Sequence, residues 1–526
     1  MVAQDLTNAV GARNRRKKND ALNRHASRLS RLWQPVRQTD TTEMESVAVR
    51  CSDYEMMRLA HMSFRPPAPV PRLQTPRSID LIRTLWRNPI EAWTQAHFEE
   101  PVVKTRLSFC DVVVVNSASA VRRVLSDNAE NYCKDHFQKR MLAVLSHGLL
   151  TAEGPQWRFQ RKLMTPLFRP ASVKGMARAM AGVVDDLVKH WSARDGSVID
   201  IAEETTELAL EVLAATIFSA ELTKRNLRPA MRMYFEALGQ IDPFDLLDLP
   251  DFIPRISRLR ASPAIRLLHR AIDDMIAARE QTLEEDRAAT THDILLLLIR
   301  ARDPKTGQRL TGREVRANIL TFMAAGHEST ANAITWTLYL LSRSLEWHER
   351  VRAEADRETN TPPESLFDRL TVTRAVVEES LRLYPPLAAI SRMARNDDEL
   401  AGIHVKAGTL IVVSPYVLHR HRSWGLGADQ FDPRRFLPGS REQINRYAYL
   451  PFGAGSRGCI GSIFALQEAT LAVAAITRNF ELTLRPDHIV WPVHRITLRP
   501  GSGLPMLVHR RVSDRRESIA RKRHYA

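Results

Sequence analysis

The chain has few cysteines and no long hydrophobic run. Its 526 residues include only Cys51, Cys110, Cys133 and Cys459, whose spacing gives neither a disulfide framework nor a zinc motif. No apolar run reaches the roughly 18 residues of a membrane-spanning helix, and the basic start of the chain has no apolar signal core. We therefore expect a soluble protein of a reducing compartment without a transmembrane anchor. The cytoplasm is the expected location, with an organelle as the second choice.

The chain also lacks internal repeats and any linker between residues 66 and 510, so one large domain is expected there. The 76 lysines and arginines exceed the 60 acidic residues by 16, and much of this excess lies near the two ends. Basic runs of this kind are typical of solvated tails. We predict a basic, disordered extension at 1–60, one domain at 61–510 and a basic tail at 511–526, and we expect no nucleic-acid partner.

Helical periodicity dominates the domain. It predicts helices at 120–125, 158–167, 173–191, 203–218, 230–238, 263–284, 315–343, 347–358 and 372–383. Strand patterns are few and occur at 102–107, 111–115, 410–413, 481–484 and 506–512. The predicted fold is mainly α with small peripheral β-sheets.

A glycine-rich loop from Phe452 to Gly461 contains the thiol of Cys459 and directly precedes an apolar helical stretch. Glycine lets the backbone pass close to a flat group, and N–H groups at a helix start stabilise a negative sulfur. The same loop also fits the dinucleotide fingerprint G-x-G-x-x-G, preceded by the strand-like segment Arg446–Leu450. A nucleotide fold would need further strand–helix units, for which too little sequence follows.

The loop resembles the haem-binding signature of the cytochrome P450 family. The matching residues are Phe452, Gly455, Arg457, Cys459 and Gly461, with Gly453 between the first two. This resemblance implies haem b between a long central helix and the C-terminal loop, with Cys459 as the iron ligand. It also implies the P450 fold from about Pro66 to Arg510.

The long apolar helix predicted around 316–341 is interrupted by Ala325, Gly326, Glu328, Ser329 and Thr330. Polar groups within a buried helix are costly unless they are used. By resemblance, Ala325 and Gly326 leave room beside the haem for O2 and substrate, and Glu328 with Ser329 or Thr330 delivers protons. The family usually has threonine where Ser329 stands. Alternatively, these hydroxyls bind carbonyls one turn back, as hydroxyl residues in helices often do.

Two further groups of residues match the family in order and spacing. Glu379, Arg382 and Arg435 are expected to form a buried network that braces the core beside the haem. Residues expected to hold the haem propionates are Trp157, Arg161 and Arg392, with His419 or His421 as a further candidate.

The resemblance implies a monooxygenase that inserts one oxygen atom from O2 into a lipophilic substrate. Electrons would come from NAD(P)H through a separate reductase and a ferredoxin- or flavodoxin-type donor. This donor would dock on a basic surface that includes Arg158, Arg161, Lys162 and Arg422. The expected pocket residues are Phe322, Ala325, 387–391 and the segment 132–150, where Lys139 or Arg140 is a candidate anchor for a carboxylate.

Two other functions remain open at this point. One is a haem-thiolate isomerase, dehydratase or peroxygenase on the same fold, which would need no electron donor. The other is a non-catalytic haem sensor whose basic tails bind nucleic acid, although no helix-turn-helix or zinc motif supports it.

Overall fold

The computed structural model describes residues 64–76, 78–106, 111–135, 138, 148–217, 256–285 and 294–511. The chain divides into the unit Met1–Ser63 and the unit Phe64–Ala526, and the description below concerns the second. The predicted extension 1–60, helix 230–238 and tail 512–526 lie outside the described residues. So do Cys51, Cys110, Lys139 and Arg140.

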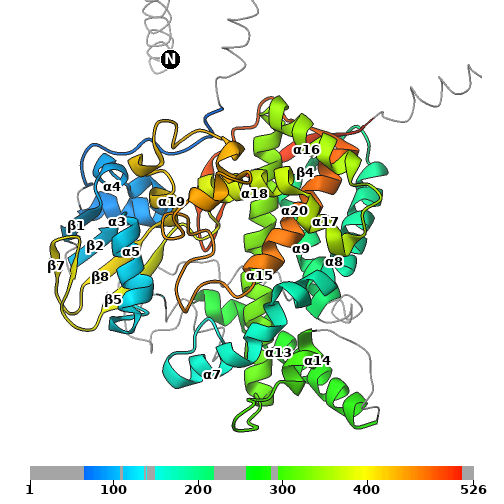
Figure 1. Ribbon diagram of the computed structural model, residues 1–526, viewed down its shortest axis with the longest axis horizontal. Helices are drawn as coiled ribbons and strands as arrows, with labels where there is room; N and C mark the ends of the chain where they lie inside the picture. Colours follow the sequence, from blue (N-terminus) through cyan, green and yellow to red (C-terminus); the bar gives the residue numbers. More distant parts are fainter. Residues whose placement is uncertain are drawn as a thin grey trace, which may run out of the picture. The chain divides into compact units, whose positions relative to one another are not determined.

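Helix α15 (Gly312–Ser342) runs through the centre of a helical layer (Figure 1). A capping box starts it, because the Thr311 hydroxyl accepts from the N–H of Glu314 while Glu314 accepts from the N–H of Thr311. The helices packed against α15 are α9 (Ile201–Ile217), α13 (Ile256–Glu285), α14 (Ile294–Arg300), α16 (Leu345–Arg357), α18 (Thr371–Leu383) and α20 (Ser462–Asn479). α8 (Pro170–Ser192) packs on α9 and α20, and α17 (Pro363–Arg369) on α8.

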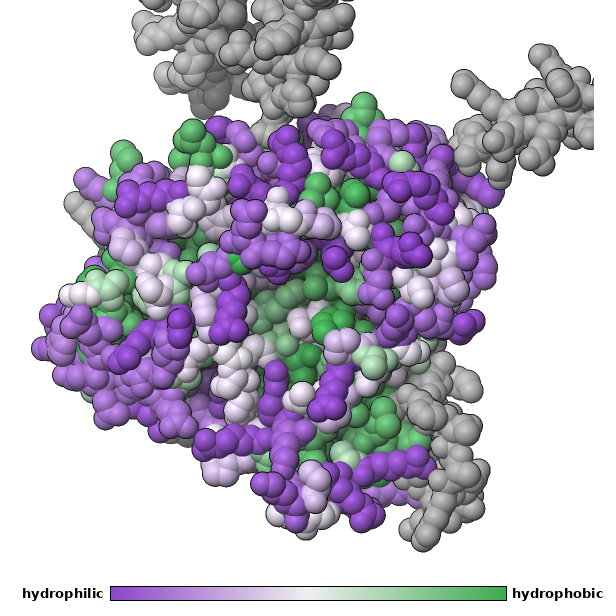
Figure 2. All heavy atoms as spheres, in the orientation of Figure 1, coloured by the Kyte–Doolittle hydropathy of each residue, from purple (hydrophilic) through white to green (hydrophobic). Residues whose placement is uncertain are grey.

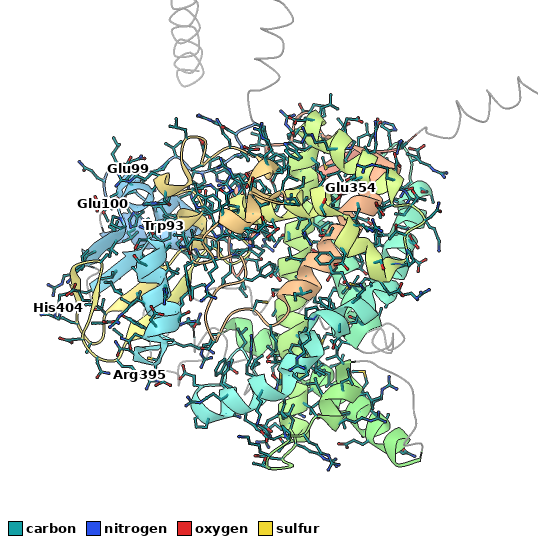
Figure 3. All side chains as sticks on the ribbon, viewed as in Figure 1. Trp93, Glu99, Glu100, Glu354, Arg395 and His404 are labelled. Carbon is teal, nitrogen blue, oxygen red and sulfur yellow. The ribbon has the colours of Figure 1, made fainter. Side chains whose placement is uncertain are left out.

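The start of α18 is capped by a residue from another helix. The carboxylate of Glu354 in α16, labelled in Figure 3, accepts from the N–H groups of Val372 and Thr373 at 2.7 and 2.8 Å. These N–H groups have no partner within their own helix, and a negative charge is favourable at a helix N-terminus. This contact fixes α18, which carries the Glu379 network, against α16.

A five-stranded sheet lies beside the helices, at the left of Figure 1. Its order is β1 (Val102–Arg106), β2 (Asp111–Val115), β8 (Leu410–Val413), β5 (Ile390–Ala394) and β3 (Tyr132–Cys133). β2 and β8 pair in parallel although about 300 residues separate them, with Val113 opposite Ile411. The short helices of this part are α3 (Ser78–Arg87), α4 (Gln95–Glu99), α5 (Ala118–Arg122) and α19 (Pro415–Leu418).

The described residues also form three smaller sheets. β9 (Phe480–Leu484) and β4 (Ser197–Asp200) flank β12 (Pro505–Arg510), β10 (Pro492–His494) pairs with β11 (Leu498–Pro500), and β6 (Asp398–Leu400) pairs with β7 (Ile403–Val405). The predicted mainly α fold with peripheral sheets is thus confirmed. No helix in the described ranges has the combination of length and apolar character that crossing a membrane requires.

Several local predictions differ from the structure. Residues 446–450 form a turn and not a strand, which removes the strand that the dinucleotide interpretation needed. The predicted helix 158–167 starts earlier, as α7 (Gly154–Met164), and ends in a 3₁₀ turn. Pro155 at its first turn explains the early start, because proline is favourable at that position. The strands β3 and β11, of two and three residues, were missed because each is too short for a period of two to be visible.

Candidate active site

A cavity of about 400 Å³ lies between α15, the start of α20 and the loop that precedes α20. Its other walls come from α7, α9 and β5. Figure 2 shows an apolar recess near the centre of the displayed face, where α15 and α20 overlap in Figure 1. The volume is in the range of sites that bind small molecules.

The thiol of Cys459 opens into this cavity. The N–H of Cys459 donates to the carbonyl of Phe452 at 2.8 Å, which closes the loop on itself. Burial raises the pKa of the Cys459 thiol, whereas the N–H of Gly461 and the charge of Arg161 lower it. A metal ion that binds a thiol displaces its proton.

The loop needs glycine at position 455. Gly455 has φ of +70°, and a Cβ placed on it would lie 1.8 Å from the carbonyl oxygen of Leu125. Cys459 therefore owes its position to close contact between this loop and residues more than 300 positions earlier.

Three guanidinium groups line the same cavity, from Arg161 of α7, Arg392 of β5 and Arg457 of the loop. Burial lowers the pKa of each, and that of Arg392 falls to about 10 through burial and the nearby charge of Arg457. The Arg457 guanidinium also stacks on Trp157, 4.5 Å from the ring centroid. A partly buried positive cluster that opens into a cavity favours a ligand with carboxylates.

The thiol and the positive cluster together fit haem. A thiolate can hold the iron, and the guanidinium groups can hold the two propionates. Apolar residues such as Phe452, Ile460 and Phe464 supply wall for the macrocycle. The expected residues Trp157, Arg161, Arg392, Arg457 and Cys459 are thus brought to one cavity by three separate segments, α7, β5 and the cysteine loop.

The opposite wall is α15, where residues 324–330 line the cavity. Gly326 also serves packing, because a Cβ there would lie 3.1 Å from Leu213 of α9. The Ser329 hydroxyl donates to the carbonyl of Ala325 at 2.6 Å, as in the alternative interpretation of this residue. Glu328 instead accepts from the hydroxyl of Thr497 at 2.7 Å. Thr330 is buried at the cavity wall.

The predicted network residues meet beside the cavity. Arg382 is fully buried and donates to both carboxylate oxygens of Glu379 at 2.7 Å. Arg435 lies 4.0 Å from Glu379, and the N–H of Asp432 donates to the same carboxylate at 2.8 Å. Arg382 also donates to the carbonyls of His419, Ala428 and Gln430. α18 is thereby fixed to the segment 419–435 that leads to the cysteine loop.

Some predicted contacts are placed elsewhere. The two ring nitrogens of His419 bind the carbonyl of Arg382 and the N–H of Leu450, so this side chain is not free for a propionate. The ring of His421 accepts from the N–H of Ser423 and does not line the cavity. Arg161, predicted both for a propionate and for the docking surface, lines the cavity and is partly exposed. Of the predicted loop 387–391, Leu387 and Ile390 reach the cavity.

The predicted wall segment 132–150 reaches the cavity through Lys134, which is buried and binds the carbonyl of Leu150, and through Leu149 and Leu150. The sequence did not indicate several other wall residues. Leu213, Ile217, Ile294, Ile496 and Thr497 come from α9, α14 and the segment before β11. No local pattern marks them, because each has the appearance of an ordinary core or loop residue.

Comparison with known proteins agrees with this geometry. The sequence profile of the family described as cytochrome P450 matches residues 67–503. Pentalenene oxygenase of Streptomyces avermitilis is 31% identical over 431 residues, covering 80% of this chain and 94% of that protein. Cyclooctat-9-en-7-ol 5-monooxygenase of Streptomyces melanosporofaciens is 30% identical over 417 residues, covering 77% and 88%. The crystal structure of the cytochrome P450DA heme domain has the same fold, with a TM-score of 0.74, 24% identity, and coverage of 85% and 99%.

Proposed function

The chain belongs to the cytochrome P450 family and is a P450 monooxygenase, and on that premise we propose the roles of its residues, its substrate class and its electron donor. The observation that carries the assignment of roles is that the Cys459 thiol and three partly buried guanidinium groups line one cavity together with α15. Cys459 would hold the haem iron, and Arg161, Arg392 and Arg457 would hold the propionates.

Bound haem with a thiolate ligand supplies the activation of O2, with one atom going to the substrate and the other leaving as water. The protein gives the substrate part of the cavity an apolar wall and supplies protons from α15. Glu328 holds a proton-accepting carboxylate at the cavity wall, next to Ser329 and Thr330. The hydroxyl of Ser329 must leave the carbonyl of Ala325 to take part, whereas Thr330 occupies a buried position.

The substrate is a lipophilic, largely hydrocarbon molecule. Phe168, Leu213, Phe322, Leu387 and Ile496 give the cavity a mainly apolar surface. The names of two relatives identify pentalenene and cyclooctat-9-en-7-ol as molecules on which those proteins act. Their chemistry, an unsaturated hydrocarbon and an alcohol of one, suits a wall of this kind.

A separate ferredoxin- or flavodoxin-type protein is the proposed electron donor, supplied by NAD(P)H through a reductase. Arg158 and Arg422 are exposed cations on the outer surface, and Lys162 is exposed although it pairs with Asp303. An acidic donor would bind there with a strong dependence on ionic strength. Electron transfer that does not change with salt would contradict this docking.

The carbon-monoxide difference spectrum of the reduced protein tests the axial ligand. We expect a red-shifted Soret band in the wild type that is lost in Cys459→Ala. Titration with unsaturated cyclic hydrocarbons should then shift the ferric spectrum at micromolar concentrations. A haem-supplied, folded protein without haem absorbance would overturn the assignment of the cavity.

A further inference from the structure

Three side chains of α15 bind one short segment near the C-terminus. Glu328, Asn332 and Trp336 follow each other at four-residue spacing, which places them on one face of the helix. Glu328 accepts from Thr497, Asn332 donates to Thr497 at 3.0 Å, and Trp336 donates to the carbonyl of Leu498 at 3.0 Å. We call this set of contacts the α15 clamp. It attaches the segment before β11 to the helix that carries the proposed proton-delivering acid.

The clamp has a fixed hydrogen-bond direction. A threonine hydroxyl has one proton, and its oxygen here accepts from the amide of Asn332. The proton of Thr497 is therefore directed to Oε1 of Glu328. Both Thr497 and Asn332 are buried, at 8% and 6% exposure, so water does not readily replace either bond.

Glu328 lies at the boundary between the cavity and solvent. Its side chain lines the cavity and is 25% exposed, while Arg499, 53% exposed, lies 4.0 Å from the same oxygen Oε1. Ile496 and Thr497 belong to the cavity wall as well. Thus the segment that contacts the substrate cavity also holds the carboxylate.

We propose that Thr497 is a positioning residue for Glu328. Asn332 orients the Thr497 hydroxyl, and this hydroxyl holds the Glu328 carboxylate where it delivers protons to the cavity. This inference rests on the proposed function of Glu328. Without the Thr497 hydroxyl, the carboxylate would turn towards solvent and Arg499, which is the charged side chain near it. Proton delivery would then fail while haem and substrate still bind.

The test compares Thr497→Val, which keeps the shape and loses the hydroxyl, with Thr497→Ser, which keeps the hydroxyl. Thr337→Val is a matched control, because Thr337 is a buried residue of α15 whose hydroxyl donates to the carbonyl of Ala333. We expect product formed per NAD(P)H consumed to fall at least about threefold in Thr497→Val, with an unchanged KM, and to recover in Thr497→Ser. The control should stay at the wild-type value.

A second measurement needs no turnover. In a double-mutant cycle of Thr497→Val and Glu328→Ala, the effects on the unfolding equilibrium constant should depart from additivity by about fivefold. Thr337→Val combined with Glu328→Ala should be additive.

Each outcome decides a different point. Additive effects in the first cycle, or a product yield in Thr497→Val equal to that of Thr337→Val, would overturn the positioning role. If Glu328→Ala itself leaves the product yield unchanged, the proposed role of Glu328 is wrong and the role of Thr497 with it. If the wild type shows no red-shifted Soret band, the proposed function is wrong. The double-mutant cycle would still measure whether Thr497 and Glu328 interact in the α15 clamp.

Discussion

The replacement Glu379→Gln should destabilise the protein strongly while changing almost no volume. Glu379 is fully buried and neutralises Arg382, which is also fully buried. The substitution removes the negative charge and one of the acceptors that Arg382 requires. It leaves a guanidinium charge in the interior with neutral acceptors only, the amide oxygen of the new glutamine and three backbone carbonyls.

The expected loss follows from these contacts. Removing one partner of a buried, paired charge costs about 3–5 kcal/mol, because the other charge stays desolvated. The N–H of Asp432 also depends on this carboxylate, although the amide oxygen of glutamine can still accept from it. We therefore expect about 3 kcal/mol, at the lower end of the range.

Urea unfolding at pH 7, followed by far-UV circular dichroism, measures this loss, and the Soret band reports haem retention in parallel. Glu346→Gln is the control. It breaks an exposed pair with Arg350 at 2.9 Å and should cost less than about 1 kcal/mol. If the two substitutions shift the unfolding midpoint equally, the buried network does not contribute to stability as reasoned here.

Two further predictions concern pH and the cysteine loop. Burial lowers the pKa of His327 to about 4 and that of His419 to about 3, so both are neutral when folded but protonate below about pH 6.5 when unfolded. The free energy of unfolding should therefore fall from pH 6.5 towards pH 4, by about 1.4 kcal/mol per pH unit for each histidine. In His327→Asn, urea unfolding at several pH values should give a slope that is smaller by the share of one histidine. An unchanged slope would contradict the buried neutral state. Gly455→Ala should abolish haem incorporation, because its Cβ would overlap the carbonyl of Leu125. The control is Gly439→Ala, because Gly439 has φ of +89° but open space around it. This variant should lose only about 1–2 kcal/mol of stability and retain the Soret band. Equal haem retention in the two variants would show that the close approach at Gly455 is not required.

The positive cluster beside the cysteine explains why the site needs its ligand. Burial lowers the pKa of both Arg392 and Arg457, and the charge of Arg457 lowers the pKa of Arg392 further. Binding of two carboxylates would relieve both costs at once. We expect the protein without haem to be less stable than the loaded protein for this reason, beyond the loss of apolar contacts in the cavity.

The sequence by itself determined the parts of this protein that depend on local chemistry. Helices with long apolar periodicity, such as α8, α9 and α15, were predicted within a few residues of their observed bounds, since burial of one face at a period of 3.6 residues is visible in the chain. The family, and Cys459 as the expected ligand, followed from a loop in which glycines and the thiol are close in sequence.

Only the tertiary structure decided which distant residues meet. Thr497 lies 169 positions from Glu328, and Ile294 reaches the cavity from α14. Ser329 and His419 appeared available in the sequence, but each is bound to a backbone group in the fold. Spacing along the chain carries no information on such contacts, because packing of α15 against α9 and the C-terminal segments fixes which side chains face the cavity.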